Sequence, residues 1–243
     1  MDDQLTLQPV LDRAVDLYPD REIVTKQPDG RVHRYTYADA YERICQLAHA
    51  LDELGVERGD RVGSVALNHY RHFELYFAPA NSGRSLHMCN MRLPMEHFVH
   101  TIEDAGDRVL FVDPAFVEKV EAAAPELDSV EQYVLLGDAV PETSLEPVVA
   151  YEDLIDGQPT EYDWPELDED AECGMCHTSG TTGLPKGVAY SHRGMYLHTL
   201  ACGHTDANGI GQDDTVLPVV PMFHANGWGL PYAAAFVGAK QVL

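Results

Sequence analysis

The sequence predicts an α/β fold in layers, with mostly parallel sheets flanked by helices. Apolar runs of strand length alternate with stretches whose apolar residues recur at helical spacing. This alternation is typical of parallel strands joined by helical crossovers. Hydrophobic residues make up 45% of the 243 residues, which is enough for a sizeable core. The length fits one large domain or two small ones.

Local signals define the elements of the first half. Pro28-Asp29-Gly30 separates two short β-type runs and indicates a hairpin. Thr36 and Asp39 have the spacing of a capping box, so we expect a helix that starts at Thr36 and ends at Gly55. The other expected elements up to residue 136 are helices over 8–18, 69–81, 94–105 and 114–123, and strands over 22–26, 32–35, 61–67, 85–89, 109–112 and 132–136.

The second half is organised around a loop that is rich in glycine and hydroxyl residues. Residues 138–170 are rich in proline and acidic residues, and we interpret them as a surface connection with a short helix near 151–155. A strand over 173–178 leads into the loop, and Ser191 caps a helix that runs to about Gly203. The remaining expected elements are strands over 188–190, 215–220 and 239–243 and a helix over 228–237.

The charge of the chain is strongly negative. There are 16 basic and 40 acidic residues, a net charge of −24, and residues 121–172 contain 17 Asp or Glu and no Lys or Arg. Such a field repels nucleic acid, so we expect no nucleic-acid partner. The acidity fits either an acidic interaction tail or a halophilic protein whose charge is screened by salt. We favour the second interpretation because the acidic residues extend well beyond one segment.

Location and cysteine content are consistent with each other. No run of eighteen apolar residues exists, so we expect no transmembrane segment. Met1-Asp2-Asp3-Gln4 lacks the features of a signal peptide, and we expect a cytoplasmic protein. Five cysteines without an export signal argue against a disulfide framework. Cys173 and Cys176 form a CxxC, which is either a redox or zinc motif or a pair on a buried strand; we favour the strand.

Residues 177–187 combine the groups that a polyphosphate needs. Their sequence is His177-Thr178-Ser179-Gly180-Thr181-Thr182-Gly183-Leu184-Pro185-Lys186-Gly187. Glycines let backbone N–H groups converge, hydroxyls add donors, and the lysine adds a positive charge. The pattern differs from the P-loop because Pro185 precedes Lys186 and Gly187 follows it. The alternative interpretation is a flexible linker.

Two blocks of sequence carry a family resemblance. The run from Thr178 to Gly187 resembles the nucleotide loop of the adenylate-forming (AMP-binding) superfamily, which includes acyl- and aryl-CoA ligases. A second block over 216–232, which contains Pro-Met-Phe-His224 and Trp228, is similar to medium- and long-chain fatty acyl-CoA synthetases. The resemblance implies ATP-dependent activation of a fatty acid to an acyl adenylate and then to an acyl-CoA. The small-molecule partners are then ATP, fatty acid and coenzyme A, with Mg²⁺ as cofactor. An aryl carboxylic acid is the second substrate class.

The resemblance also assigns roles to residues. The ATP phosphates would be held by Thr178, Ser179, Gly180, Thr181, Thr182, Gly183 and Lys186. Thr178 would lie near the Mg²⁺. Lys186 and His224 would be catalytic, with His224 between nucleotide and acyl carboxylate. Trp228 would gate the acyl tunnel. The alternatives are an ordinary buried histidine at 224 and a plain core residue at 228.

Three further histidines, His192, His198 and His204, invite a metal interpretation. A spacing of six residues does not bring their side chains to one helix face, so we expect no metal there.

By the same resemblance, residues 1–243 are the N-terminal part of an AMP-binding domain. The small C-terminal domain of the family and its catalytic lysine do not occur before Leu243. We therefore expect a fragment that is inactive alone. The alternatives are a non-catalytic truncated remnant and a half that pairs with a separately encoded remainder; a homodimer is a further expectation drawn from the fatty-acid branch.

Overall fold

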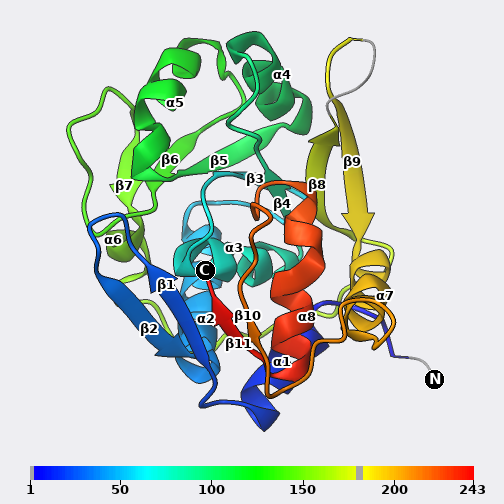
Figure 1. Ribbon diagram of the computed structural model, residues 1–243. Coiled ribbons are helices and arrows are strands. Elements are labelled where there is room, and N and C mark those ends of the chain that lie inside the picture. Colours follow the sequence, from blue (N-terminus) through cyan, green and yellow to red (C-terminus); the bar gives the residue numbers. More distant parts are fainter. Residues whose placement is uncertain (1–2, 179–182) are drawn as a thin grey trace.

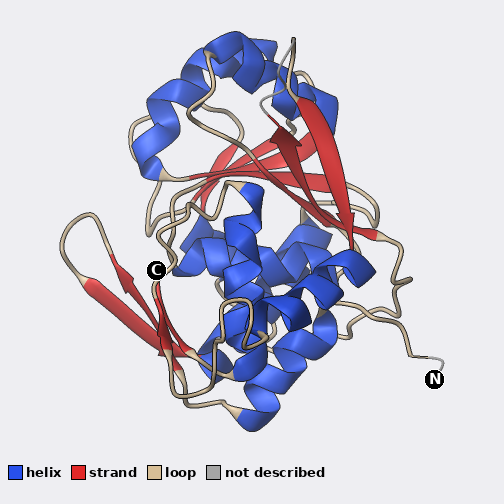
Figure 2. Ribbon diagram, turned by 45° about the vertical axis from the view of Figure 1, so that its right-hand side comes forward, coloured by secondary structure: helices blue, strands red, loops and turns tan. Residues whose placement is uncertain are grey.

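Two β-sheets with helices between them organise the chain (Figures 1 and 2). The structure is a computed structural model that describes residues 3–178 and 183–243. A further pair of helices, α4 and α5, covers the outer face of the larger sheet (Figure 1). The layered α/β class predicted from the sequence is therefore confirmed.

The larger sheet has seven strands in the order β7-β6-β5-β3-β4-β8-β9. Every neighbouring pair is parallel except β8 with β9, which form an antiparallel hairpin. The chain moves from β3 to β4 on one side and then crosses to β5 on the other, so the strand order reverses around β3. The strands are β3 (Arg61–Val65), β4 (Ser85–Met88), β5 (Asp107–Val112), β6 (Gln132–Leu135), β7 (Val148–Ala150), β8 (Glu172–Thr178) and β9 (Lys186–Ser191).

The smaller sheet combines two strands from the first part of the chain with two strands from the last part. Its order is β10-β11-β1-β2, and β1 pairs in parallel with β11 and antiparallel with β2. Its strands are β1 (Glu22–Lys26), β2 (Val32–Thr36), β10 (Thr215–Val216) and β11 (Lys240–Val242). The β1–β2 pair is the hairpin that Pro28-Asp29-Gly30 predicted.

The helices follow the predicted order. The capping box at Thr36 and Asp39 is present, and the Ser191 side chain caps the later helix by accepting a hydrogen bond from Gly194 N. The α-helices are α1 (Gln8–Leu17), α2 (Tyr37–Glu53), α3 (Tyr70–Asn81), α4 (Met95–Ala105), α5 (Val117–Ala123), α6 (Tyr151–Ile155), α7 (His192–Gly203) and α8 (Leu230–Val237). Three short 3₁₀ helices are η1 (Pro114–Phe116), η2 (Ala124–Glu126) and η3 (Ala225–Gly229).

Both faces of the larger sheet are buried. Along β5, Val109 and Phe111 belong to the core shared with α1–α3, whereas Leu110 and Val112 belong to the core under α4 and α5. Burial on both sides explains why these strands read as continuous apolar runs. In the part of the chain that the structure describes, no helix combines the length and apolar character needed to cross a bilayer.

Several predicted boundaries differ from the structure, and one strand was not predicted. The strand expected over 215–220 covers only Thr215–Val216, because Pro218 lacks a donor and Val219 is 86% exposed. The helix expected over 114–123 is split into η1 and α5, and the helix expected from residue 228 begins at Leu230. The three-residue strand β7 within the acidic connection was not predicted.

Candidate functional site

The candidate site lies where three strands of the larger sheet end. β3 leads to Asn68, β4 to Cys89, and β8 ends at Thr178. Because these strands are parallel, their carboxyl ends lie on one edge of the sheet. Ligands of open α/β sheets bind at this edge, near the point where strand order reverses.

The two sides of the 177–187 loop are paired with each other. Thr178 and Lys186 are register partners in the β8–β9 hairpin, and the Thr178 hydroxyl donates to the Lys186 carbonyl at 3.4 Å. Both residues are exposed. Gly183 has φ of 116°, a backbone that side chains disfavour. Of the predicted phosphate-binding residues, Ser179, Gly180, Thr181 and Thr182 lie outside the described residues.

Helix α4 contacts both sides of the loop. The Asp104 carboxylate lies 3.1 Å from His177 Nε2, on the strand that enters the loop. His100 Nε2 lies 3.2 Å from the Pro185 carbonyl, on the side that leaves it. Figure 1 shows the hairpin rising beside α4. The base of the loop is therefore held from one helix.

The segment over 218–222, which precedes His224, is hydrogen-bonded to Asn68, just after the end of β3. Asn68 donates through Nδ2 to the carbonyls of Pro218 (3.0 Å) and Val220 (3.2 Å). Its Oδ1 accepts from the Met222 N–H at 2.7 Å. The Tyr76 hydroxyl of α3 donates to the Met222 carbonyl at 2.6 Å. One asparagine and one tyrosine therefore fix the segment that precedes His224.

Residues 225–229 form a left-handed turn. Ala225, Asn226 and Trp228 have φ of 47°, 53° and 57°, and the two glycines between and after them are also left-handed. Left-handed backbone costs roughly 1–2 kcal/mol per non-glycine residue, so this turn is strained. Cys176 of β8 contacts it, with Sγ donating to the Asn226 side-chain carbonyl at 3.2 Å. Strain of this kind concentrates at functional sites.

The turn presents the two predicted acyl-site residues outward. His224 is exposed and Trp228 is 60% exposed, so neither is an ordinary core residue in this chain. Strand β8 connects the turn and the loop. Its Cys176 contacts the turn, and its last residue, Thr178, begins the loop. Among the described residues, no hydrogen bond joins His224 to Thr178 or Lys186.

The CxxC pair is structural, as predicted. Cys173 and Cys176 are buried on β8, and their thiols donate to the Tyr190 carbonyl and the Asn226 side chain. Burial raises the pKa of both thiols, that of Cys176 to about 11. A thiol with a raised pKa is neither a good nucleophile nor a ready metal ligand.

His192, His198 and His204 form no metal-binding group in the described parts of the chain. His192 is buried at the start of α7, where its Nδ1 accepts from the Leu7 N–H at 3.2 Å.

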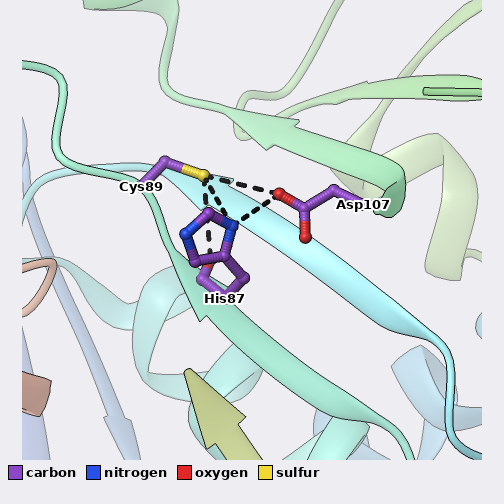
Figure 3. Close-up of side chains that lie close together, drawn as sticks. All are labelled: His87, Cys89 and Asp107. Carbon is purple, nitrogen blue, oxygen red and sulfur yellow. Dashed lines mark hydrogen bonds and ion pairs between the residues drawn. The ribbon is translucent and has the colours of Figure 1, made fainter. Parts of the chain in front are cut away.

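Sequence reasoning missed a buried polar group behind the loop. His87, Cys89 and Asp107 meet between the sheet and α4, with His87 Nδ1 at 2.6 Å from Asp107 Oδ2 (Figure 3). The signal available in the sequence was weak: single polar residues inside otherwise apolar strands.

A cavity of about 410 Å³ lies away from the loop. It is bounded by the β1–β2 hairpin and the ends of β3, β5 and β6, and none of the predicted site residues lines it. Its arginines, Arg31 and Arg71, are both paired with Asp138. The charge of these two arginines is therefore already balanced within the protein.

Comparisons with known proteins cover nearly the whole chain. A family model described as AMP-binding enzyme matches residues 11–243. A long-chain-fatty-acid–CoA ligase of Thermus thermophilus is 46% identical over 243 residues, covering 100% of this chain and 44% of that protein. A medium-chain-fatty-acid–CoA ligase of Ectopseudomonas oleovorans is 38% identical over 245 residues, covering 100% of this chain and 45% of that protein.

A solved structure shares the fold. The crystal structure of an anthranilate CoA ligase in complex with anthranoyl-AMP matches with a TM-score of 0.87 and 25% identity, covering 98% of this chain and 44% of that one. The chain thus spans less than half the length of these relatives.

Proposed function

The chain belongs to the AMP-binding enzyme family, and from this premise we propose that it forms the phosphate- and carboxylate-binding part of an ATP-dependent acid–thiol ligase. The whole enzyme converts a fatty acid to an acyl adenylate and then to an acyl-CoA. The observation that carries the proposal is the shared strand β8, which ends at the Thr178–Lys186 pair and also contacts the turn beside His224.

The chemistry of the first step matches the groups at this edge. In-line attack of a carboxylate on the α-phosphorus requires that the charge on the leaving pyrophosphate be neutralised. Lys186, the loop hydroxyls and the loop N–H groups are suited to that task by position and charge. The exposed Thr178 hydroxyl is an oxygen donor of the type that hard cations accept, which suits a nearby Mg²⁺. That ion, when bound, neutralises phosphate charge.

The residues predicted to bind the acyl substrate favour an alkyl chain. His224 is exposed at the start of the strained turn, where a neutral imidazole can orient a carboxylate. Trp228 is 60% exposed, and Leu217 and Val219 in the segment that precedes His224 are 62% and 86% exposed. A large and mostly apolar indole is suited to closing an alkyl channel against water. The fold shared with an anthranilate ligase keeps aryl acids as the second substrate class.

The chain spans 44% of the Thermus ligase, and we infer that residues 1–243 do not turn over alone. ATP–pyrophosphate exchange tests this with two proteins: residues 1–243, and the same residues fused in register to the remaining part of the Thermus ligase. We expect exchange with fatty acids from the fusion only. A folded fusion that exchanges with no carboxylate contradicts the ligase assignment and favours a non-catalytic remnant. Exchange by residues 1–243 alone contradicts the incomplete-site inference.

The same assay tests whether Trp228 gates the acyl channel. In the fusion, Trp228→Ala should change the dependence of exchange on fatty-acid chain length, with Trp164→Phe as the matched control. An unchanged chain-length profile in Trp228→Ala argues against the gate.

A further inference from the structure

A chain of four side chains runs behind the phosphate loop from β5 to α4. Asp107 Oδ2 lies 2.6 Å from His87 Nδ1, and His87 Nε2 lies 3.0 Å from His177 Nδ1. His177 Nε2 then lies 3.1 Å from Asp104 Oδ2. The first three side chains are nearly inaccessible, at 0%, 1% and 2% exposure. The third member, His177, directly precedes Thr178 in the sequence.

A glycine permits this arrangement. Gly63 of β3 is the register partner of His87 on one side and of Leu110 on the other. A Cβ at position 63 would lie 2.5 Å from Asp107 Oδ2. The missing side chain therefore lets β4 and β5 present His87 and Asp107 to each other across β3.

Hydrogen bonding, not metal coordination, explains the group in Figure 3. A metal bound to both His87 Nδ1 and Asp107 Oδ2 would hold these atoms about 3 Å apart or more, whereas they are 2.6 Å apart. Cys89 Sγ lies 3.8 Å from the same carboxylate oxygen. Burial raises the pKa of the Cys89 thiol well above its ordinary value, so it stays protonated as a donor.

Counting hydrogen-bond donors shows that this series of four side chains needs one more proton than two neutral imidazoles supply. With both carboxylates ionised, the two end contacts each require an imidazole N–H. The His87–His177 contact requires one N–H facing one lone pair. Three of the four ring nitrogens must therefore carry hydrogen, whereas two neutral imidazoles supply two. If both rings were neutral while both carboxylates were ionised, one of the three contacts would place two acceptors against each other.

The surrounding groups locate that proton. His177 faces Asp104, whose side chain is 46% exposed to water. His87 instead lies against the fully buried Asp107, which accepts from both His87 and Cys89. The remaining charges nearby are Arg61 and Glu172, which pair with each other at 2.7 Å. The Arg61 charge also acts on Asp107 and Asp104.

We propose that His87 is a buried imidazolium that positions His177, and through it the base of the phosphate loop. His177 directly precedes Thr178, and α4 holds both sides of the loop through Asp104 and His100. Loss of the proton leaves one of the three contacts with two facing acceptors, which releases His177 from this arrangement and shifts Thr178 with it. The link to nucleotide binding rests on the proposed function, whereas the proton count does not.

Nitrogen-15 NMR of the histidine rings tests the proton count directly. His87→Gln and His177→Gln assign the signals, and His97→Gln on the same helix as Asp104 is the control. Near neutral pH we expect three protonated ring nitrogens and one unprotonated nitrogen across His87 and His177. Two protonated and two unprotonated nitrogens overturn the proposal, as do four protonated ones.

MgATP binding tests the positioning role. Asp104→Ala removes the carboxylate that accepts from His177, so we expect about tenfold weaker MgATP binding. Asp104→Asn, which still accepts from His177, should bind as the unaltered chain does. Asp107→Asn keeps the shape and can donate its amide N–H to His87 Nδ1, so we expect loss of the third ring N–H with little change in MgATP binding. His97→Gln should bind as the unaltered chain does.

The outcomes separate the two proposals. Unaltered MgATP affinity in Asp104→Ala overturns the positioning role. If the unaltered chain binds no MgATP, the proposed function fails, while the nitrogen count still decides whether His87 is an imidazolium. If Asp107→Asn does not fold, the Asp104 pair and the nitrogen count decide.

Discussion

Two histidines in the core are kept neutral by their surroundings. His72 is fully buried, with Nδ1 at 2.9 Å from the Leu67 carbonyl and Nε2 at 3.2 Å from the Ser64 hydroxyl. His192 is equally buried and accepts from the Leu7 N–H. Burial lowers the pKa of His72 to about 3 and that of His192 to about 4. These residues serve the fold, which the sequence alone did not show.

This burial makes stability depend on pH. The unfolded chain binds these protons near the ordinary histidine pKa of about 6.5, before the folded chain does. The stability associated with neutral His192 is present above about pH 6.5 and is lost as pH falls towards its folded pKa of about 4. The loss is about 3 kcal/mol.

Urea unfolding at a series of pH values measures this effect. His192→Gln should lower the slope of unfolding free energy against pH over that window, while the exposed His198→Gln should keep the slope of the unaltered chain. Equal slopes in all three proteins contradict the neutral, buried state of His192.

At the scale of elements, local signals predicted starts and ends, and long-range contacts decided the rest. The caps at Thr36 and Ser191 are encoded within four residues, so their helices begin as predicted. Asn68 holds Met222, and Cys176 contacts Asn226 in the left-handed turn over 225–229; both partners are distant in sequence. The His87–Asp107 contact depends on the register of β4 and β5 against Gly63. No local pattern encodes such contacts.

The capping box of α2 is testable by substitution. The Thr36 hydroxyl accepts from the Asp39 N–H at 3.1 Å, and the Asp39 carboxylate accepts from the Thr36 N–H at 2.8 Å. Thr36→Ala should lower the free energy of unfolding by about 1 kcal/mol, and Thr36→Ser should retain it. Chemical denaturation measures both. Equal stability of Thr36→Ala and the unaltered chain would show that the cap contributes nothing.

The whole molecule carries a net charge of −24. Repulsion within such a charge distribution weakens the folded state, and salt screens it over distances that shrink from about 10 Å at 0.1 M to about 3 Å at 1 M. The described arginines are largely paired: Arg43, Arg61, Arg71 and Arg84 all contact carboxylates. The excess negative charge therefore lies mainly on the surface.

A halophilic protein should become more stable as salt is added. We expect concentrated KCl to stabilise the chain by about 2 kcal/mol, which corresponds to roughly 4–8 °C in the unfolding midpoint for a chain of this size. Thermal unfolding followed by circular dichroism measures it, with sucrose of equal osmolality as a control for general solute effects. A midpoint that is flat or falls with KCl contradicts the halophilic interpretation.

The central claim is that the Thr178–Lys186 hairpin binds the phosphates of ATP, and calorimetric titration with MgATP tests it most directly. Lys186→Ala should weaken binding about tenfold or more, because a charged contact to phosphate is lost. Lys26→Ala changes the net charge by the same amount on the distant strand β1 and should bind as the unaltered chain does. Equal affinities for both variants, or no MgATP binding by the unaltered chain, would contradict the claim.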